Sequence, residues 1–158
     1  MKLINKEIDL SIIIDDALLT RLDKHALKHY PKEFGGLLIG HYAEDKKTVF
    51  ITETILPKKY TSTKYSFTRG SDGLRGILEA YHKGKPSLIY VGEWHTHPDS
   101  PAIPSMTDLA ALDQIVSHDE VYISNPILLI LSITKQASAA CFYVHYQNKI
   151  YNYEEENY

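Results

Sequence analysis

The sequence is poor in cysteine, in long apolar runs and in charge of one sign. Its single cysteine, Cys141, excludes an internal disulfide, and the apolar setting AACFYV predicts a buried strand position rather than a catalytic thiolate. No apolar run approaches the about 20 residues that cross a bilayer. The formal net charge is only −3. Since nucleic acids and anionic membranes favour basic surfaces, we expect neither as a partner.

The length and composition are those of a globular protein. The chain has 158 residues, of which 44% are hydrophobic and 23% charged. No repeat, linker or composition break divides it, so we expect one domain over residues 1–158, with residues 154–158 as a flexible acidic tail. The first ten residues, MKLINKEIDL, lack the apolar region of a signal peptide, and we expect a cytoplasmic protein.

The hydrophobic pattern alternates between periods of two and of about 3.6 residues, which predicts strands interspersed with helices. We expect a mixed α+β (α/β) fold with a central, mostly antiparallel sheet flanked by helices. The expected helices run from a cap at Asp15 or Asp16 to Pro31, from a cap at Ser71 or Asp72 to Lys83, and over residues 105–116. The expected strands are residues 8–14, 37–42, 48–56, 65–68, 87–96, 126–134, 137–146 and 149–153.

Two histidines one residue apart, His95 and His97, lie at the end of an expected strand, so both side chains point to the same face. A proline-rich loop follows, and Ser105 then opens an expected helix with Asp108 in its first turn. Asp108 can complete a three-ligand site, and this donor set suits zinc better than calcium or magnesium. The spacing leaves a second interpretation open, because Ser-x-x-Asp also caps helices and paired histidines can form an ordinary polar face.

A metal-dependent hydrolase also needs a general base, and two glutamates are candidates. Glu93 shares a strand face with the histidines, at a spacing that equally suits a supporting hydrogen bond or an ion pair. Glu33 lies far upstream, just before a glycine pair and a buried strand, where a solvated loop carboxylate is the ordinary alternative. The pattern alone does not choose between the two.

Two motifs resemble the signature of the JAMM (also called MPN or JAB) metalloproteases. The sequence HTHP begins at His95, and SMTD follows from Ser105 after six residues. About sixty residues upstream, EFGGLLIG from Glu33 fits the Glu-x-x-Gly-x-Leu-x-Gly element of the family. The resemblance covers residues 8–146 and shows no departure at a catalytic position, which counts against the metal-free scaffold members.

The resemblance implies a role for each of these residues. His95, His97 and Asp108 are expected to bind Zn²⁺, Glu33 to act as the general base, and Ser105 to stabilise the oxyanion of the tetrahedral intermediate. Glu93 becomes a supporting residue. The implied fold is the MPN fold, similar to that of cytidine deaminases. The implied activity is cleavage of an isopeptide or peptide bond after the C-terminal tail of a ubiquitin-like protein.

The sequence GEWHTHP is similar to that of the standalone prokaryotic branch of this family, which includes components of anti-phage (CBASS-like) operons. There the implied substrate is a nucleotidyltransferase conjugated through its C-terminus. Two alternatives stay open: release of cysteine or a small amine from a sulfur-carrier protein, and a non-catalytic scaffold. The implied partner is a ubiquitin-like protein or another conjugated protein, and the oligomeric state is left open.

Two further segments allow only limited interpretation. Residues 57–70 mix lysines with aromatic residues and form either part of a substrate groove or a plain surface loop. His25 and His29 lie four residues apart on the first expected helix, but the glutamate of an HExxH motif is absent. We therefore expect a solvated helix face there rather than a second metal site.

Overall fold

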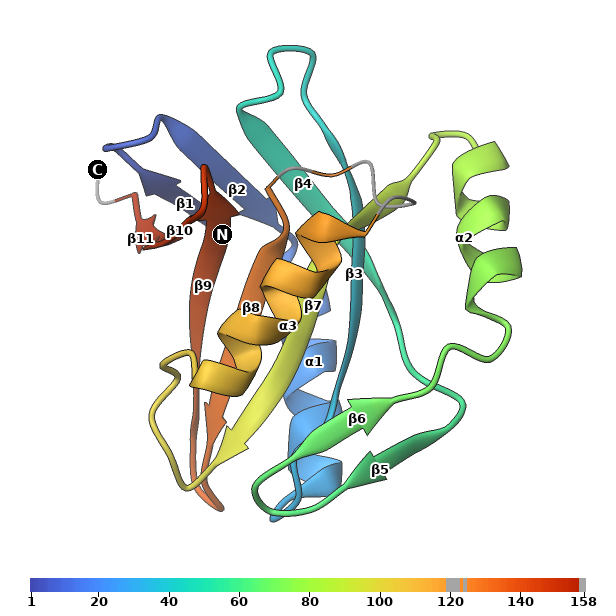
Figure 1. Ribbon diagram of the computed structural model, residues 1–158. Coiled ribbons are helices and arrows are strands. Elements are labelled where there is room, and N and C mark those ends of the chain that lie inside the picture. Colours follow the sequence, from blue (N-terminus) through green and yellow to red (C-terminus); the bar gives the residue numbers. More distant parts are fainter. Residues whose placement is uncertain (119–122, 124, 157–158) are drawn as a thin grey trace.

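The computed structural model of the protein describes residues 1–118, 123 and 125–156, and shows a large sheet with three helices packed against it (Figure 1). The helices are α1 (Asp16–His29), α2 (Leu74–Lys83) and α3 (Met106–Ser117). The strands are β1 (Lys2–Asn5), β2 (Leu10–Ile14), β3 (Gly35–Tyr42), β4 (Thr48–Ile55), β5 (Tyr60–Ser62), β6 (Phe67–Arg69), β7 (Ile89–Pro98), β8 (Ile127–Ile133), β9 (Ser138–Tyr146), β10 (Lys149–Asn152) and β11 (Glu154–Glu155).

Nine of the described strands form one sheet in the order β10-β9-β8-β7-β3-β4-β2-β1-β11. The pairs β2/β4 and β7/β8 are parallel, and the other six are antiparallel. The expected mixed class with a mostly antiparallel sheet is therefore confirmed. The parallel pair β7/β8 matters most for the site, because its connection carries α3 back over the sheet.

Helices cover both faces of the sheet, and β8 shows how the sequence specifies this. Leu129 and Leu131 point to the main core, where they pack with buried residues of α1 such as Leu18. The alternate residues Leu128 and Ile130 point to the other face and pack under α3. A strand buried on both faces reads as a continuous apolar run, which is why ILLILSI lacks the alternation of a half-exposed strand. None of the described helices is long and apolar enough to cross a membrane.

The helix starts were partly predictable. Asp15 caps α1 by accepting a hydrogen bond from the Ala17 amide at 2.9 Å, as the sequence predicts. The expected cap of α2 at Ser71 or Asp72 is wrong: the N-cap is Gly73, with a φ of 71° and no side-chain cap hydrogen bond. The Asp72 carboxylate instead pairs with the Lys59 ammonium at 2.8 Å.

Residues 57–70 contain more regular structure than their sequence indicates. The sequence predicts an irregular excursion with one short strand, whereas β5 and β6 pair antiparallel as a separate two-stranded sheet. We call β5, β6 and their connecting turn, residues 60–69, the ribbon. It lies at the same end of the molecule as the carboxyl end of β7 (Figure 1).

The expected flexible tail is wrong for the described residues 154–156. Glu154 and Glu155 form β11, which pairs with Ile4 and Leu3 of β1. Tyr153, which is 7% exposed, lies in the main core. Because β10 and β11 are adjacent in sequence yet lie at opposite ends of the strand order, Tyr153 joins the two edges of the curled sheet. Residues 157–158 lie outside the described residues.

The expected burial of Cys141 is also wrong. Cys141 does lie in a strand, opposite Ile130, but its side chain is exposed. The first four residues of β9 are all exposed. Strand β10 pairs only with residues 143–146, so this end of β9 forms the edge of the sheet. An apolar sequence setting therefore did not indicate burial here.

Candidate metal centre

Strand β7 directs its two histidines to the face of the sheet that α3 covers. In β7, Trp94 and Thr96 alternate with the histidines and are buried in the opposite direction, at 1% and 0% exposure. In the parallel β7/β8 pair His95 lies opposite Ile130, which packs under α3. The period of two predicted this shared face for His95 and His97, and the structure confirms it.

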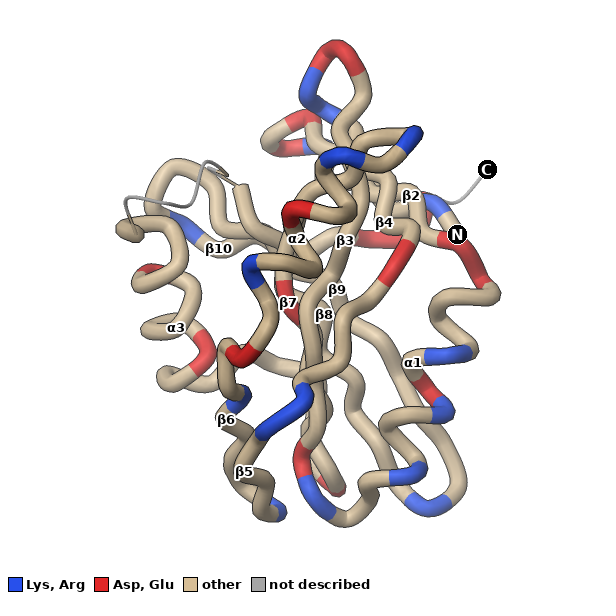
Figure 2. The backbone as a smooth tube through the Cα atoms, turned by 90° about the vertical axis from the view of Figure 1, so that its right-hand side faces the viewer, with Lys and Arg blue, Asp and Glu red and all other residues tan. Residues whose placement is uncertain are grey.

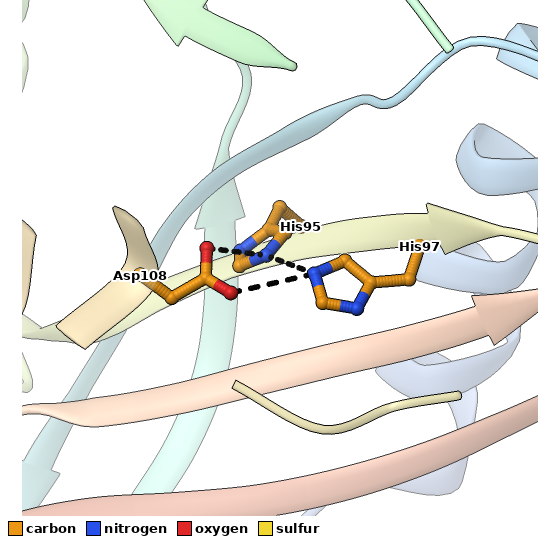
Figure 3. Close-up of side chains that lie close together, drawn as sticks. All are labelled: His95, His97 and Asp108. Carbon is orange, nitrogen blue, oxygen red and sulfur yellow. Dashed lines mark hydrogen bonds and ion pairs between the residues drawn. The ribbon is translucent and has the colours of Figure 1, made fainter. Parts of the chain in front are cut away.

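The imidazoles and the Asp108 carboxylate converge on one point (Figure 3). The Nε2 atoms of His95 and His97 lie 3.0 Å apart. His95 Nε2 lies 3.1 Å from Asp108 Oδ1, and His97 Nε2 lies 3.4 Å from Asp108 Oδ2. Among the described residues this is the one group of three or more histidine, cysteine or acidic side chains close enough to share a metal ion.

The start of α3 places Asp108. Its amide donates to Ser105 Oγ at 3.2 Å, and its carboxylate accepts from the Ser105 amide at 2.6 Å, which completes a capping box. The Ser105 hydroxyl also donates to Asp108 Oδ2, at 2.7 Å. The two interpretations of Ser-x-x-Asp are therefore compatible: the residues cap the helix, and the cap directs the carboxylate towards the histidines.

The charge state of the carboxylate suits a metal ligand. Burial opposes ionisation of Asp108, but hydrogen bonds from His95 and His97 outweigh it and hold the pKa of this carboxyl well below its usual range. The hydrogen bond with Asp108 likewise raises the pKa of His97, although burial partly opposes this. Protons and a metal ion would therefore compete for the same nitrogen and oxygen atoms.

A backbone carbonyl orients His97. Its Nδ1 donates to the Pro101 carbonyl oxygen at 3.0 Å, so Nε2, which faces His95 and Asp108, is the nitrogen available to a metal ion once it is deprotonated. Metal-binding histidines almost always have such a partner on the nitrogen that does not bind the metal. Two imidazole nitrogens and one carboxylate are also a usual three-ligand set of catalytic zinc sites. The residues present thus fit the ion that the sequence resemblance implies.

Gly35 allows β3 to approach β7 closely beside the site. It lies opposite His95, and a Cβ atom there would lie 2.2 Å from the Trp94 carbonyl oxygen and 2.9 Å from the His95 Cβ. Real Cβ atoms do not approach backbone this closely, so the position requires glycine. This contact brings the segment just before β3, which includes Glu33, to the histidines.

The two candidate bases differ in their surroundings. Both Glu33 and Glu93 line the cavity that His95, His97, Ser105 and Asp108 also line. Burial raises the pKa of the Glu33 carboxyl above its ordinary value, and the nearby His95 and His97 partly oppose this rise. A carboxyl with a raised pKa beside a metal site is well suited to accept and return a proton.

Glu93 forms an ion pair with Arg69. Its Oε1 accepts a hydrogen bond from Arg69 Nη2 at 2.6 Å, and both side chains are about three-quarters buried. This ion pair connects β6 of the ribbon to β7, two residues before His95. The sequence did not identify Arg69 as part of the site, because nothing in its local pattern distinguishes it from the lysines around it.

The cavity over His95, His97 and Asp108 has a volume of about 570 Å³ and lies between the ribbon, β7 and α3. The groove interpretation of residues 57–70 is supported, since five ribbon residues line this space. Basic residues lie along the ribbon, while α3 carries acidic ones (Figure 2). The lining includes Lys64, Tyr65, Ser66, Phe67 and Thr68 of the ribbon, Pro101 and Ile103 of the loop, and Ala111, Leu112 and Ile115 of α3.

Comparison with known proteins agrees with this arrangement. Residues 15–144 match the family described as prokaryotic homologues of the JAB domain. The chain is 35% identical over 122 residues to a CD-NTase/cGAS isopeptidase of Enterobacter hormaechei, covering 77% of this chain and 67% of that protein. It is 23% identical over 122 residues to the probable metalloprotease y4qB of Sinorhizobium fredii, covering 76% and 74% of the two chains.

A solved structure supports the fold independently. The solution structure of a protein from Desulfitobacterium hafniense superposes with a TM-score of 0.62, covering 89% of this chain and 88% of that chain at 17% sequence identity. At this identity the likeness concerns the fold alone.

Proposed function

This chain belongs to the family of prokaryotic homologues of the JAB domain, a family of hydrolases, and we propose that it is a zinc-dependent isopeptidase. One observation carries the proposal. Two histidine Nε2 atoms and the Asp108 carboxylate converge beneath a cavity that Glu33 also lines. A three-ligand site with a carboxyl nearby is the arrangement that metal-assisted hydrolysis of an amide requires.

His95, His97 and Asp108 would hold the zinc ion. The ion would supply Lewis acidity, which activates water and polarises a carbonyl group. Glu33 would take a proton from the attacking water and pass it to the leaving amine, so that the amide C–N bond breaks as a C–O bond forms. The Ser105 hydroxyl lines the cavity and donates to Asp108 Oδ2 in this structure; by turning away from that oxygen it would donate to the negative charge that develops on the carbonyl oxygen.

The proposed substrate is a protein conjugated through its C-terminal carboxyl. Three relatives carry the name CD-NTase/cGAS isopeptidase. By analogy with them, we propose that the bond cut here joins the C-terminal tail of a nucleotidyltransferase, or of a ubiquitin-like protein, to an amine of the target. The enzyme would thus reverse conjugation, in a setting such as anti-phage defence. The cavity of about 570 Å³ between the ribbon and α3 offers room for an extended chain segment.

The test uses purified protein and a defined conjugate. A bacterial cGAS-like nucleotidyltransferase is joined through its last carboxyl to the ε-amino group of a lysine peptide, and peptide release is followed. Cleavage should stop after treatment with a chelator and return with one equivalent of zinc. Undiminished cleavage by fully metal-free protein would overturn the proposal, as would no cleavage of this conjugate or of a ubiquitin-like one by protein holding a full equivalent of zinc.

Two variants assign the general base. Glu33→Gln should keep a full equivalent of zinc and lose about 100- to 10,000-fold in rate, the usual contribution of a general base. Glu93→Gln is the matched control, because it removes a carboxylate from β7 while leaving Glu33 in place. It should lose far less activity. The reverse result would move the base to Glu93.

A further inference from the structure

Four hydrogen bonds hold the backbone of Glu33 and Phe34, two from each side. The Glu33 amide donates to the Thr63 carbonyl oxygen at 2.8 Å, and the Ser62 hydroxyl donates to the Glu33 carbonyl oxygen. On the other side, the Phe34 amide donates to Thr96 Oγ1 at 2.9 Å, and the Thr96 amide donates to the Phe34 carbonyl oxygen at 2.8 Å. The two residues are therefore held between the ribbon and β7.

Aromatic side chains pack the ribbon against the segment of Glu33 and Phe34. Phe34 is 3% exposed and stacks face to face on His29 of α1, with ring centroids 3.6 Å apart. Tyr60 and Phe67 of the ribbon lie with their ring centroids 5.1 and 5.7 Å from that of Phe34. His29 is thus half-buried rather than part of a solvated face. Because Ser62 alternates with Thr61 along β5, it shares the inward face with Tyr60.

Further contacts fix the ribbon itself. Its turn is closed by a hydrogen bond from the Thr63 amide to the Ser66 carbonyl oxygen at 2.9 Å. Arg69 pairs with Glu93 at 2.6 Å, and Lys64 pairs with Asp99 at 3.4 Å, two residues after His97. Both pairs join the ribbon to the segment that carries the histidines. These contacts place the Ser62 hydroxyl beside the Glu33 carbonyl oxygen.

We propose that Ser62 is a positioning residue, which holds the Glu33 carboxylate over the metal ligands through its hydrogen bond to the Glu33 carbonyl oxygen. The proposal rests on the proposed function, in which Glu33 is the base. Without the hydroxyl, the peptide group between Glu33 and Phe34 loses its donor on the ribbon side. The side chain of Glu33 leaves the backbone next to this peptide group, so a small rotation displaces the carboxylate. A displacement of about 1 Å at a reacting group can lower a rate about 100-fold.

The same contact connects substrate binding to the base. Tyr65 and Phe67 line the cavity, while Ser62 and Thr63, on the same ribbon, hold Glu33. A substrate that displaces the ribbon would therefore displace the base with it. A substrate that pushes the ribbon towards Phe34 would keep Glu33 in its position.

The test compares three substitutions at position 62 with a neighbour. Ser62→Ala and Ser62→Val remove the hydroxyl. Ser62→Thr keeps a hydroxyl on a side chain that has nearly the same shape as valine. We expect kcat on the nucleotidyltransferase–lysine conjugate to fall about 10- to 100-fold in the Ala and Val variants, with KM within about twofold and zinc content unchanged. The Thr variant should restore kcat. Thr61→Ala, on the exposed opposite face of β5, is the matched control and should match the wild type.

A second readout is independent of activity. The Glu33 and Phe34 amides of metal-free protein should exchange with solvent at least about tenfold faster in Ser62→Val than in Ser62→Thr, because peptide movement opens both hydrogen bonds. Equal kcat in the Val and Thr variants, or a change in KM alone, would overturn the positioning role of Ser62. The proposed function would still stand in that case, provided that the wild type cleaves the conjugate. Absence of cleavage by the zinc-loaded wild type would instead overturn the proposed function.

Discussion

Thr96 Oγ1 accepts a hydrogen bond from the Phe34 amide at 2.9 Å, so the residue between the two histidines is joined to the residue next to Glu33. The regular pairing of β3 with β7 begins one residue later, at Gly35 and His95. The threonine side chain therefore extends the contact between β3 and β7 by one residue, beside Glu33 and between the two histidines. The segments that carry His95, His97 and Glu33 are parts of one hydrogen-bonded unit.

Removing the Thr96 hydroxyl should destabilise the protein. Thr96→Val keeps the shape of the side chain but leaves the buried Phe34 amide without an acceptor, which costs about 1–3 kcal/mol in the free energy of unfolding. Thr96→Ser keeps the acceptor and is the matched control. Urea unfolding of the metal-free variants measures the difference. Equal stability of the Val and Ser variants would show that the hydrogen bond contributes nothing.

Substitution can separate the capping role of Asp108 from its proposed role as a zinc ligand. Asp108→Ala removes both the proposed ligand and the capping box, so we expect the loss of bound zinc and a decrease of about 1 kcal/mol in the stability of the metal-free protein. Asp108→Asn retains a side-chain acceptor for the Ser105 amide but not the charge. It should keep most of the stability and still bind zinc weakly. Metal analysis and urea unfolding give the two quantities, and full zinc occupancy in the Ala variant would refute the ligand role.

Burial of Glu33 should make the metal-free protein less stable as the pH rises. The folded-state pKa of this carboxyl is raised, so between its ordinary value and the raised one the folded state binds more protons than the unfolded state. Stability is then lost as the pH rises through this window, and Glu33→Gln avoids the loss. We expect metal-free Glu33→Gln to melt above the wild type at about pH 7, with a smaller gap at about pH 4. A gap of constant size would contradict the assignment to this carboxyl.

Tyr153 should contribute far more to stability than its place in an acidic tail indicates. Its ring is buried in the main core where the two edges of the sheet meet. Tyr153→Ala should lower the free energy of unfolding by about 3–5 kcal/mol, as for other large aromatic residues in a core. Glu154→Ala, at the exposed next position, should change it by less than about 0.5 kcal/mol. Thermal and urea unfolding distinguish the two, and a similar small effect at both positions would contradict this packing.

The sequence predicted the convergence of His95, His97 and Asp108 because the signal is local. A strand period of two places His95 and His97 on one face, and the pattern from Ser105 to Asp108 specifies a helix start whatever the rest of the chain does. The choice of Glu33 over Glu93 depended instead on the family resemblance. The contacts that favour Glu33 join segments far apart in sequence, namely the Arg69–Glu93 ion pair and the approach of Gly35 to β7.

What the sequence did not indicate depends on tertiary partners. The pairing of β1 with β11 joins segments from the two ends of the chain, and neither short strand has a strong pattern of its own. Exposure of Cys141 follows from the short length of β10, which no property of AACFYV encodes. Ser62 had no special signal, since a serine in a polar, basic segment is ordinary. Its partner became visible only when the ribbon was placed against Glu33.

Closure of the sheet at Tyr153 has a consequence for how the protein loses activity on warming. Chain ends usually fray first, but here the described ends lie in the paired strands β1 and β11. Among the described residues, β5 and β6 pair with each other and with no other strand, and the ribbon is held to the rest by side chains and by the backbone hydrogen bond from the Glu33 amide to the Thr63 carbonyl oxygen. Local opening should therefore begin at the ribbon and release Glu33 while the sheet is still intact. Inactivation on heating would then precede melting and reverse on cooling.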